Sequence, residues 1–200
     1  MSKPVLAIVI GSTRPGRVGP KFAAWFRSRA IDHGGFDAVE LVDLAALRLP
    51  FLDEPGYPRL HQYVHEHTIN WSRIVEHADA FVFVTPEYNF GYSAALKNAI
   101  DYLSQEWADK PVGFLSYGGV AAGTRAVQQL KQVVTALKMI PVAESVNIPF
   151  FNQFIDDSGT VRPNDLMTRS ADAMLDELAR VTALVRPKTA AVSEPVVPVG

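Results

Sequence analysis

The feature that most constrains the fold is an unbroken apolar run near the N-terminus, Val5–Ile10, which passes directly into residues 11–19. An apolar run without alternation predicts a strand that is buried on both faces, as in a parallel sheet. Glycine and hydroxyl residues end the run, and a helical pattern follows it, so the stretch predicts a strand–loop–helix unit. Such a unit turns loop N–H groups and a helix N-terminus toward one point, which favours an anion.

The loop at residues 11–19 contains donors suited to phosphate, namely Ser12, Thr13, Arg14 and Arg17. It lacks Gly-Lys-Ser/Thr and G-x-G-x-x-G, which argues against a nucleoside triphosphate and a dinucleotide. Hydroxyl donors favour a terminal phosphate monoester. The alternative is that Ser12 and Thr13 only cap the following helix and that the arginines are solvated.

The composition excludes several classes of protein. The chain has 200 residues, 48% of them hydrophobic, which predicts one domain with a large core. A formal net charge of −2 provides no basic surplus for a nucleic-acid partner. The lack of cysteine excludes disulfides and thiolate chemistry, and no segment has the length of a membrane span. We therefore expect a soluble, cytoplasmic protein without a membrane or nucleic-acid partner.

Strand and helix patterns alternate along the rest of the chain. Strands are predicted at residues 38–44, 80–85, 111–117 and 139–148, and helices at 20–31, 61–77, 94–104, 126–137 and 165–185. The domain is expected to span residues 1–185, followed by a disordered tail at 186–200. A proline-rich surface loop is expected at 50–58.

Two histidines in the predicted helix 61–77 have the i,i+4 spacing that can hold a metal ion. They are His61 and His65, but the segment has no H-E-x-x-H order and supplies no completing carboxylate. We therefore expect no metal site.

Alternating strands and helices predict a parallel sheet with helices on both faces. The strand at 38–44 alternates apolar with acidic residues and belongs at an edge, whereas the fully apolar strands belong in the middle. The strand order 2-1-3-4-5 satisfies both conditions. Ligands bind such sheets beyond the carboxyl ends of the strands, where the strand order reverses.

This topology brings three loops together, at residues 11–19, 86–92 and 118–124. The second is rich in aromatic and polar residues, and the third contains three glycines that allow close backbone approach to a ligand. A phosphate loop beside these two suits a flat aromatic molecule with one phosphate. FMN fits this description.

Four motifs resemble the NADPH-dependent FMN reductase family of flavodoxin-like proteins. They are Gly11-Ser12-x-Arg14, Pro86-Glu87-Tyr88-Asn89, Lys97-Asn98-Ala99-Ile100-Asp101 and Gly118-Gly119. The resemblance runs from about residue 4 to about residue 185. It implies a flavodoxin-like three-layer sandwich with bound FMN. It also implies two-electron transfer, by hydride from NADPH or NADH, to a small-molecule acceptor such as a quinone, an azo compound or a metal oxyanion.

The resemblance also implies roles for individual residues. The FMN phosphate would contact Ser12, Arg14, Arg17, Val18 and Gly19; the ribityl chain and ring would contact Pro86, Glu87, Tyr88 and Asn89; and the pyrimidine edge would face Ser116, Gly118 and Gly119. Many relatives have a serine where Gly19 stands, and we expect Arg17 to compensate. No catalytic side chain is expected, because FMN carries the chemistry. A homodimer or homotetramer is expected, with contacts through the helices that start near Ser93 and Thr124.

Three other functions remain open from the sequence. The chain could be a flavodoxin-type electron carrier, a flavin reductase that supplies free reduced FMN to a partner monooxygenase, or a flavin-free structural or regulatory protein. The balanced charge, without an acidic docking patch, argues against the electron carrier.

Overall fold

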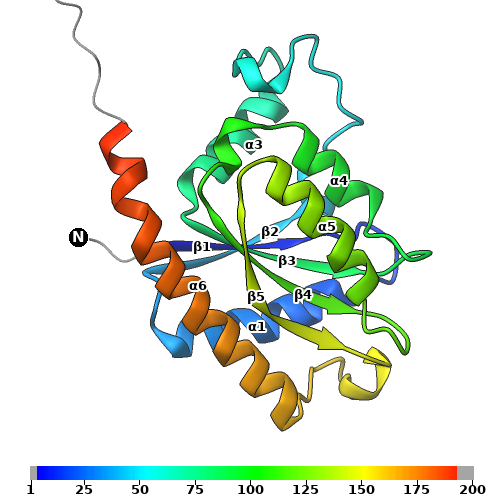
Figure 1. The fold of residues 1–200 in the computed structure, drawn as a ribbon. Coiled ribbons are helices and arrows are strands. Elements are labelled where there is room, and N and C mark those ends of the chain that lie inside the picture. Colours follow the sequence, from blue (N-terminus) through cyan, green and yellow to red (C-terminus); the bar gives the residue numbers. More distant parts are fainter. Residues whose placement is uncertain (1–3, 193–200) are drawn as a thin grey trace, which may run out of the picture.

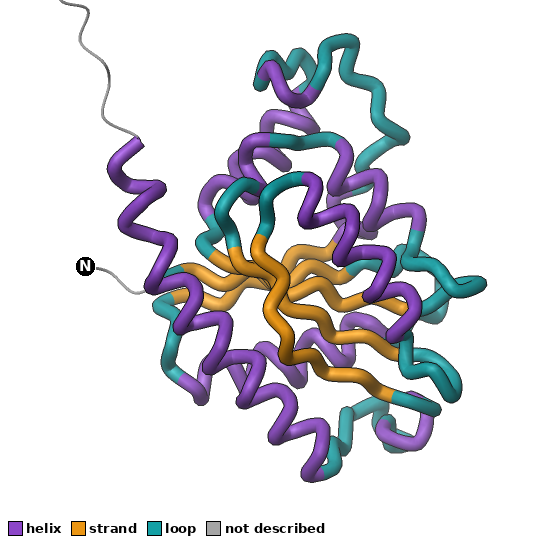
Figure 2. Tube along the Cα trace, in the orientation of Figure 1, coloured by secondary structure: helices purple, strands orange, loops and turns teal. Residues whose placement is uncertain are grey.

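The computed structural model describes residues 4–192, which fold as a parallel sheet between two layers of helices (Figures 1 and 2). The strands are β1 (Val5–Ile10), β2 (Ala38–Asp43), β3 (Ala80–Pro86), β4 (Pro111–Tyr117) and β5 (Ile140–Ile148). Their order is β2-β1-β3-β4-β5, and every neighbouring pair is parallel. The predicted flavodoxin-like topology and strand order are confirmed.

The helices divide between the two faces of the sheet. One face carries α1 (Gly19–His33) and α6 (Asp165–Val192), and the other carries α3 (Glu66–His77), α4 (Ala94–Asp101) and α5 (Thr124–Ala136) (Figure 1). Short helical turns fill the connections at α2 (Leu44–Leu47), η1 (Pro58–Leu60), η2 (Gln105–Trp107) and η3 (Phe151–Phe154). The turns α2 and η1 lie where the sequence predicted a strand end and an irregular loop.

The sheet separates two hydrophobic cores. Because successive strand residues point to opposite faces, Ile8 and Val82 pack toward α1 and α6, whereas Val9 and Phe83 pack toward α3, α4 and α5. The central strands β3 and β4 are buried along their whole length, whereas β2 is partly exposed, as expected at an edge. The unbroken apolar runs of β3 and β4 are therefore explained by burial on both faces of the sheet.

The prediction of a helix over residues 61–77 is wrong at its start, because α3 begins at Glu66. The carboxylate of Glu54 accepts hydrogen bonds from the N–H groups of Val64 and His65, at 3.0 and 3.1 Å, and so holds these residues outside the helix. His61 and His65 therefore share no helix face. Among residues 4–192 no cluster of histidine and acidic side chains is arranged to hold a metal ion.

Two further helix ends differ from the prediction by more than two residues. Helix α4 ends at Asp101 instead of residue 104, and α6 continues to Val192, past residue 185. The first part of the predicted disordered tail is thus helical, and residues 193–200 lie outside the described residues. Within the described part of the chain, no helix combines the length and apolarity that crossing a membrane requires.

Candidate functional site

A pocket of about 390 Å³ opens at the carboxyl ends of β1, β3 and β4, a size typical of small-molecule sites. It is lined by Ser12, Arg14, Gly16, Arg17, Val18, Pro86, Glu87, Tyr88, Tyr117, Gly118, Phe151 and Asn152. Loops from all three predicted segments therefore meet at one cavity. The segment after β5 adds a fourth wall that the sequence did not indicate.

The loop after β1 presents a set of unpartnered backbone donors. Within residues 4–192, no hydrogen bond is donated by the N–H groups of Ser12, Thr13, Arg14, Gly16, Val18 and Gly19. The loop itself is fixed, because the Gly11 N–H donates to the Val84 carbonyl at 2.9 Å and the Arg17 N–H donates to the Arg14 carbonyl at 3.1 Å. Free N–H groups at the start of α1 favour an anion.

The two arginines of this loop differ in whether their guanidinium groups already have partners within the protein. The Arg17 guanidinium pairs with both carboxylate oxygens of Asp43, at 2.5 and 2.6 Å, and also donates to the Ser12 carbonyl at 2.8 Å. This pair raises the pKa of Arg17 and lowers that of Asp43. The Arg14 guanidinium makes no hydrogen bond or ion pair with any described residue, so its charge is available for a ligand.

The Arg17–Asp43 pair changes the expected role of Arg17. The guanidinium lines the pocket, but its donors are used to join the loop to the end of β2. This geometry argues against Arg17 as the substitute for the hydroxyl missing at Gly19.

The loop after β3 contributes both a hydroxyl and a buried carboxylate. The Tyr88 hydroxyl lies 2.8 Å from Ser12 Oγ, which joins two walls of the pocket. The Glu87 side chain is only 7% exposed and is paired with Arg125 through Oε1. Its Oε2 is buried and has no hydrogen-bond partner among the described residues. An acceptor without a donor favours a ligand that brings N–H or O–H groups.

The loop after β4 approaches the pocket with its backbone. A Cβ atom at Gly118 would lie 3.1 Å from the Gly123 nitrogen, so the close packing of this turn favours glycine. The Gly118 N–H donates to the Ile148 carbonyl at 3.2 Å, whereas the Gly119 N–H has no partner among residues 4–192. Of the two glycines, Gly119 is the one with a free donor.

Four of the predicted site residues do not line the pocket: Gly19, Asn89, Ser116 and Gly119. Ser116 is fully buried, and its hydroxyl is used within the protein, at 2.8 Å from the Ala122 carbonyl and 2.9 Å from Asn147 Oδ1. Asn89 lies exposed at the tip of its turn, with φ +48°. These roles remain predictions, and Ser116 is placed to support the loop.

Four residues that line the pocket were not among the predicted site residues: Gly16, Tyr117, Phe151 and Asn152. Tyr117 is 4% exposed, and its ring packs between Phe22 and Phe151, with centroid distances of 5.4 and 5.5 Å. Because Tyr117 is the last residue of a buried strand, the sequence predicts only that it belongs to the hydrophobic core. The one available signal was Gly19, whose missing side chain leaves space for a large neighbour.

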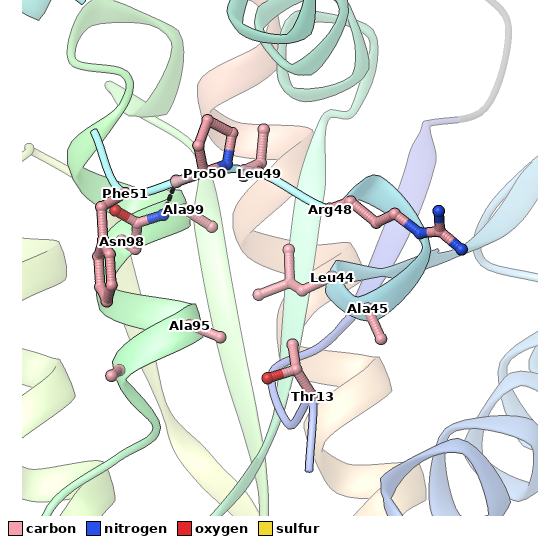
Figure 3. A pocket seen from close by; sticks show the side chains of 11 residues that line it. Thr13, Leu44, Ala45, Arg48, Leu49, Pro50, Phe51, Ala95, Asn98 and Ala99 are labelled. Atoms are coloured by element: carbon pink, nitrogen blue, oxygen red, sulfur yellow. Dashed lines mark hydrogen bonds between the residues drawn. The ribbon is translucent and has the colours of Figure 1, made fainter. Parts of the chain in front are cut away.

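A second, larger cavity of about 550 Å³ lies beside Thr13, between α2 and α4 (Figure 3). Its walls are mainly alkyl side chains, and Arg48 is the only charged residue among those that line it. Figure 3 shows the Arg48 guanidinium directed away from Asn98 and Pro50. Asn98 is already used, because it donates to the Pro50 carbonyl at 2.6 Å and accepts from the Leu52 N–H at 2.9 Å.

The donors and the orphaned acceptor of the smaller pocket fit FMN. Free N–H groups and Arg14 suit its phosphate, and the unpartnered Glu87 oxygen suits the hydroxyl and N–H groups of its ribityl chain and ring. This match concerns chemistry and is independent of any relative.

Comparison with known proteins agrees with this chemistry. The family model for NADPH-dependent FMN reductase matches residues 4–153. An NAD(P)H-dependent FMN reductase of Schizosaccharomyces pombe is 42% identical over 150 residues, which cover 73% of this chain and 74% of that protein. An NAD(P)H:quinone oxidoreductase of Solanum tuberosum is 44% identical over 103 residues, 48% of each chain.

A solved structure supports the fold alone. A flavoenzyme NAD(P)H:(acceptor) oxidoreductase from Paracoccus denitrificans superposes with a TM-score of 0.71 at 21% identity, covering 91% of this chain and 98% of that one. The sequence matches place the chain among enzymes that use FMN and NAD(P)H. The chain belongs to the NADPH-dependent FMN reductase family.

Proposed function

We propose that the pocket at the ends of β1, β3 and β4 holds FMN with its phosphate on the loop after β1, and that the enzyme reduces a small planar acceptor such as a quinone. The observation that carries this proposal is the set of unpartnered N–H groups in residues 12–19 beside Arg14, whose charge has no partner among the described residues. When bound, FMN accepts a hydride from NAD(P)H and passes two electrons to the acceptor.

The role of the protein is to bind FMN, to orient it and to stabilise the charge that develops on it. Ser12 and Tyr88 join two pocket walls, and Glu87 Oε2 is free to accept a hydrogen bond. Gly119 does not line the pocket, but it follows the pocket residue Gly118 and its N–H has no partner among the described residues, so we assign it the role of stabilising negative charge at the pocket's edge. As expected from the sequence, we assign the chemistry to the cofactor and no proton transfer to a side chain.

The surroundings of the pocket favour an apolar acceptor. Phe90, Val120 and Phe150 follow β3, β4 and β5, and they are 60, 77 and 60% exposed. Exposed apolar side chains from three neighbouring loops suit a flat aromatic molecule better than a charged one. A quinone, the acceptor in the name of the Solanum tuberosum relative, is a flat molecule of this type. The proposal also includes a homodimer or homotetramer, which is based on the sequence resemblance. It includes a cytoplasmic location, which is based on the lack of cysteine in the sequence.

The test is anaerobic mixing of the FMN-loaded protein with NADPH, followed by addition of a quinone. We expect the flavin absorbance band to bleach and then to return. A band that bleaches with dithionite but not with NADPH or NADH would overturn the reductase proposal in favour of an electron carrier. Loss of FMN on gel filtration would instead support a flavin reductase that releases its product.

A further inference from the structure

The position of Gly19 is coupled to that of Tyr117. A Cβ atom at residue 19 would lie 3.0 Å from the Tyr117 hydroxyl oxygen and 3.8 Å from its ring carbon Cζ. The hydroxyl of a β4 residue therefore occupies the space beside the first residue of α1. A side chain at position 19 and the hydroxyl of Tyr117 compete for the same volume.

The surroundings of this hydroxyl are those of the predicted phosphate site. Burial and the neighbouring Tyr88 raise the pKa of Tyr117, so its hydroxyl stays protonated at neutral pH. Ser12, Arg17 and Arg14 lie close enough to lower this pKa, but by less. The rings of Phe22 and Phe151 fix the side chain from both sides. The hydroxyl is thus held beside Gly19, the first residue of α1, whose N–H group donates no hydrogen bond to any described residue.

We infer that the Tyr117 hydroxyl is a ligand of the FMN phosphate, and that it supplies the hydrogen bond for which a serine side chain at position 19 is absent. The inference rests on the proposed phosphate site and adds a residue from a strand that was expected to contribute only through the loop that follows it. It also explains Gly19, because a larger residue there would displace the hydroxyl.

The first experiment compares FMN with riboflavin, which lacks the phosphate, by quenching of flavin fluorescence on the apoprotein. Tyr117→Phe should bind FMN roughly 10- to 100-fold more weakly, the loss expected for a hydrogen bond to a charged group, and should bind riboflavin as the wild type does. Tyr92→Phe is the matched control, because the Tyr92 hydroxyl lies outside the pocket and has no hydrogen-bond partner among residues 4–192. It should change neither affinity.

The second experiment uses the coupling between the two positions. Gly19→Ser alone should weaken FMN binding, because its Cβ meets the Tyr117 hydroxyl, whereas Gly19→Ser combined with Tyr117→Phe should recover most of the affinity that Tyr117→Phe loses. The contact of the new Cβ with Ile10 Cγ2, at 3.2 Å, is the same in both variants, so their difference isolates Tyr117.

The outcomes separate this inference from the proposal beneath it. A wild type that does not prefer FMN to riboflavin overturns the phosphate site itself. A wild type that does prefer FMN, with equal losses for both flavins in a folded Tyr117→Phe variant, overturns only the role of Tyr117. Thermal unfolding of each apoprotein identifies a variant that fails to fold, and the double variant then decides whether a hydroxyl at this place restores discrimination.

Discussion

The two cavities beside the loop after β1 differ in chemistry more than in size. The larger one, between α2 and α4, has mainly alkyl walls. The side-chain amide of Asn98 there already donates to the Pro50 carbonyl and accepts from the Leu52 N–H. The smaller one gathers free N–H groups, an unpaired arginine and an orphaned carboxylate oxygen of described residues. The contrast teaches that unsatisfied donors and acceptors, and not volume, are what distinguish the smaller cavity as our proposed cofactor site.

The largest expected effect separates the arginines of the two cavities. Arg14→Ala should weaken FMN binding roughly 10- to 100-fold, because a charge-assisted contact to phosphate is lost, and should leave the unfolding midpoint of the apoprotein nearly unchanged. Arg48→Ala, in the larger cavity, is the control and should leave FMN affinity as it is. FMN affinity is measured by fluorescence titration. Equal losses of affinity in the two variants would show that the two cavities do not differ in their contribution to FMN binding.

Arg17→Ala should act on stability first and on the cofactor second. It leaves Asp43 partly buried without its bidentate partner, so we expect the free energy of unfolding to fall by roughly 1–3 kcal/mol. FMN affinity should fall less than in Arg14→Ala, because the Arg17 guanidinium bonds to Asp43 and not to the phosphate. Urea unfolding of the apoproteins measures the loss of stability, and fluorescence titration measures the loss of FMN affinity. A larger loss of affinity in Arg17→Ala than in Arg14→Ala would show that Arg17 is a direct phosphate ligand.

Acid should loosen the same loop. The pKa of Asp43 is lowered in the folded state, chiefly by hydrogen bonding to Arg17, so its contribution is present above the ordinary value of 3.8 and is lost as the pH falls through the lower folded value. We expect wild-type FMN affinity to decline faster below about pH 4 than that of Asp43→Asn, which is already weakened at neutral pH. Parallel declines would show that other carboxylates control release.

The smallest effect is expected from filling the larger cavity. Ala95 lines that cavity and not the smaller one, so Ala95→Leu should enter free space and leave FMN affinity within about twofold of the wild type. A large loss of FMN binding in a folded variant would show that the cofactor extends past Thr13 into this second cavity.

The sequence predicted the sheet and its order because the apolar runs are unambiguous and parallel connections follow strict rules. It also predicted which loops meet, including Ser12, Arg14 and Glu87 as pocket residues. It could not predict long-range polar partners. The Glu54 carboxylate delays the start of α3, and Asp43 takes the charge of Arg17, and neither pairing leaves a local pattern.

Tyr117 was missed for a related reason. The direction of a strand-end side chain depends on the space left by another element, here the first residue of α1. Gly19, which stands where a serine was expected, indicates this space only when its position relative to Tyr117 is known.

The hydrogen bond between Ser12 and Tyr88 joins residues 76 positions apart, and Asn152 closes the same pocket from beyond β5. During synthesis, β1 must therefore wait for β3 to leave the ribosome before the centre of the sheet can pair. A nascent chain that ends before residue 152 lacks one wall of the cavity. With FMN in the site proposed above, cofactor capture would be a late event in the life of each new chain, and the pocket around the loop after β1, although that loop is made first, would be completed last.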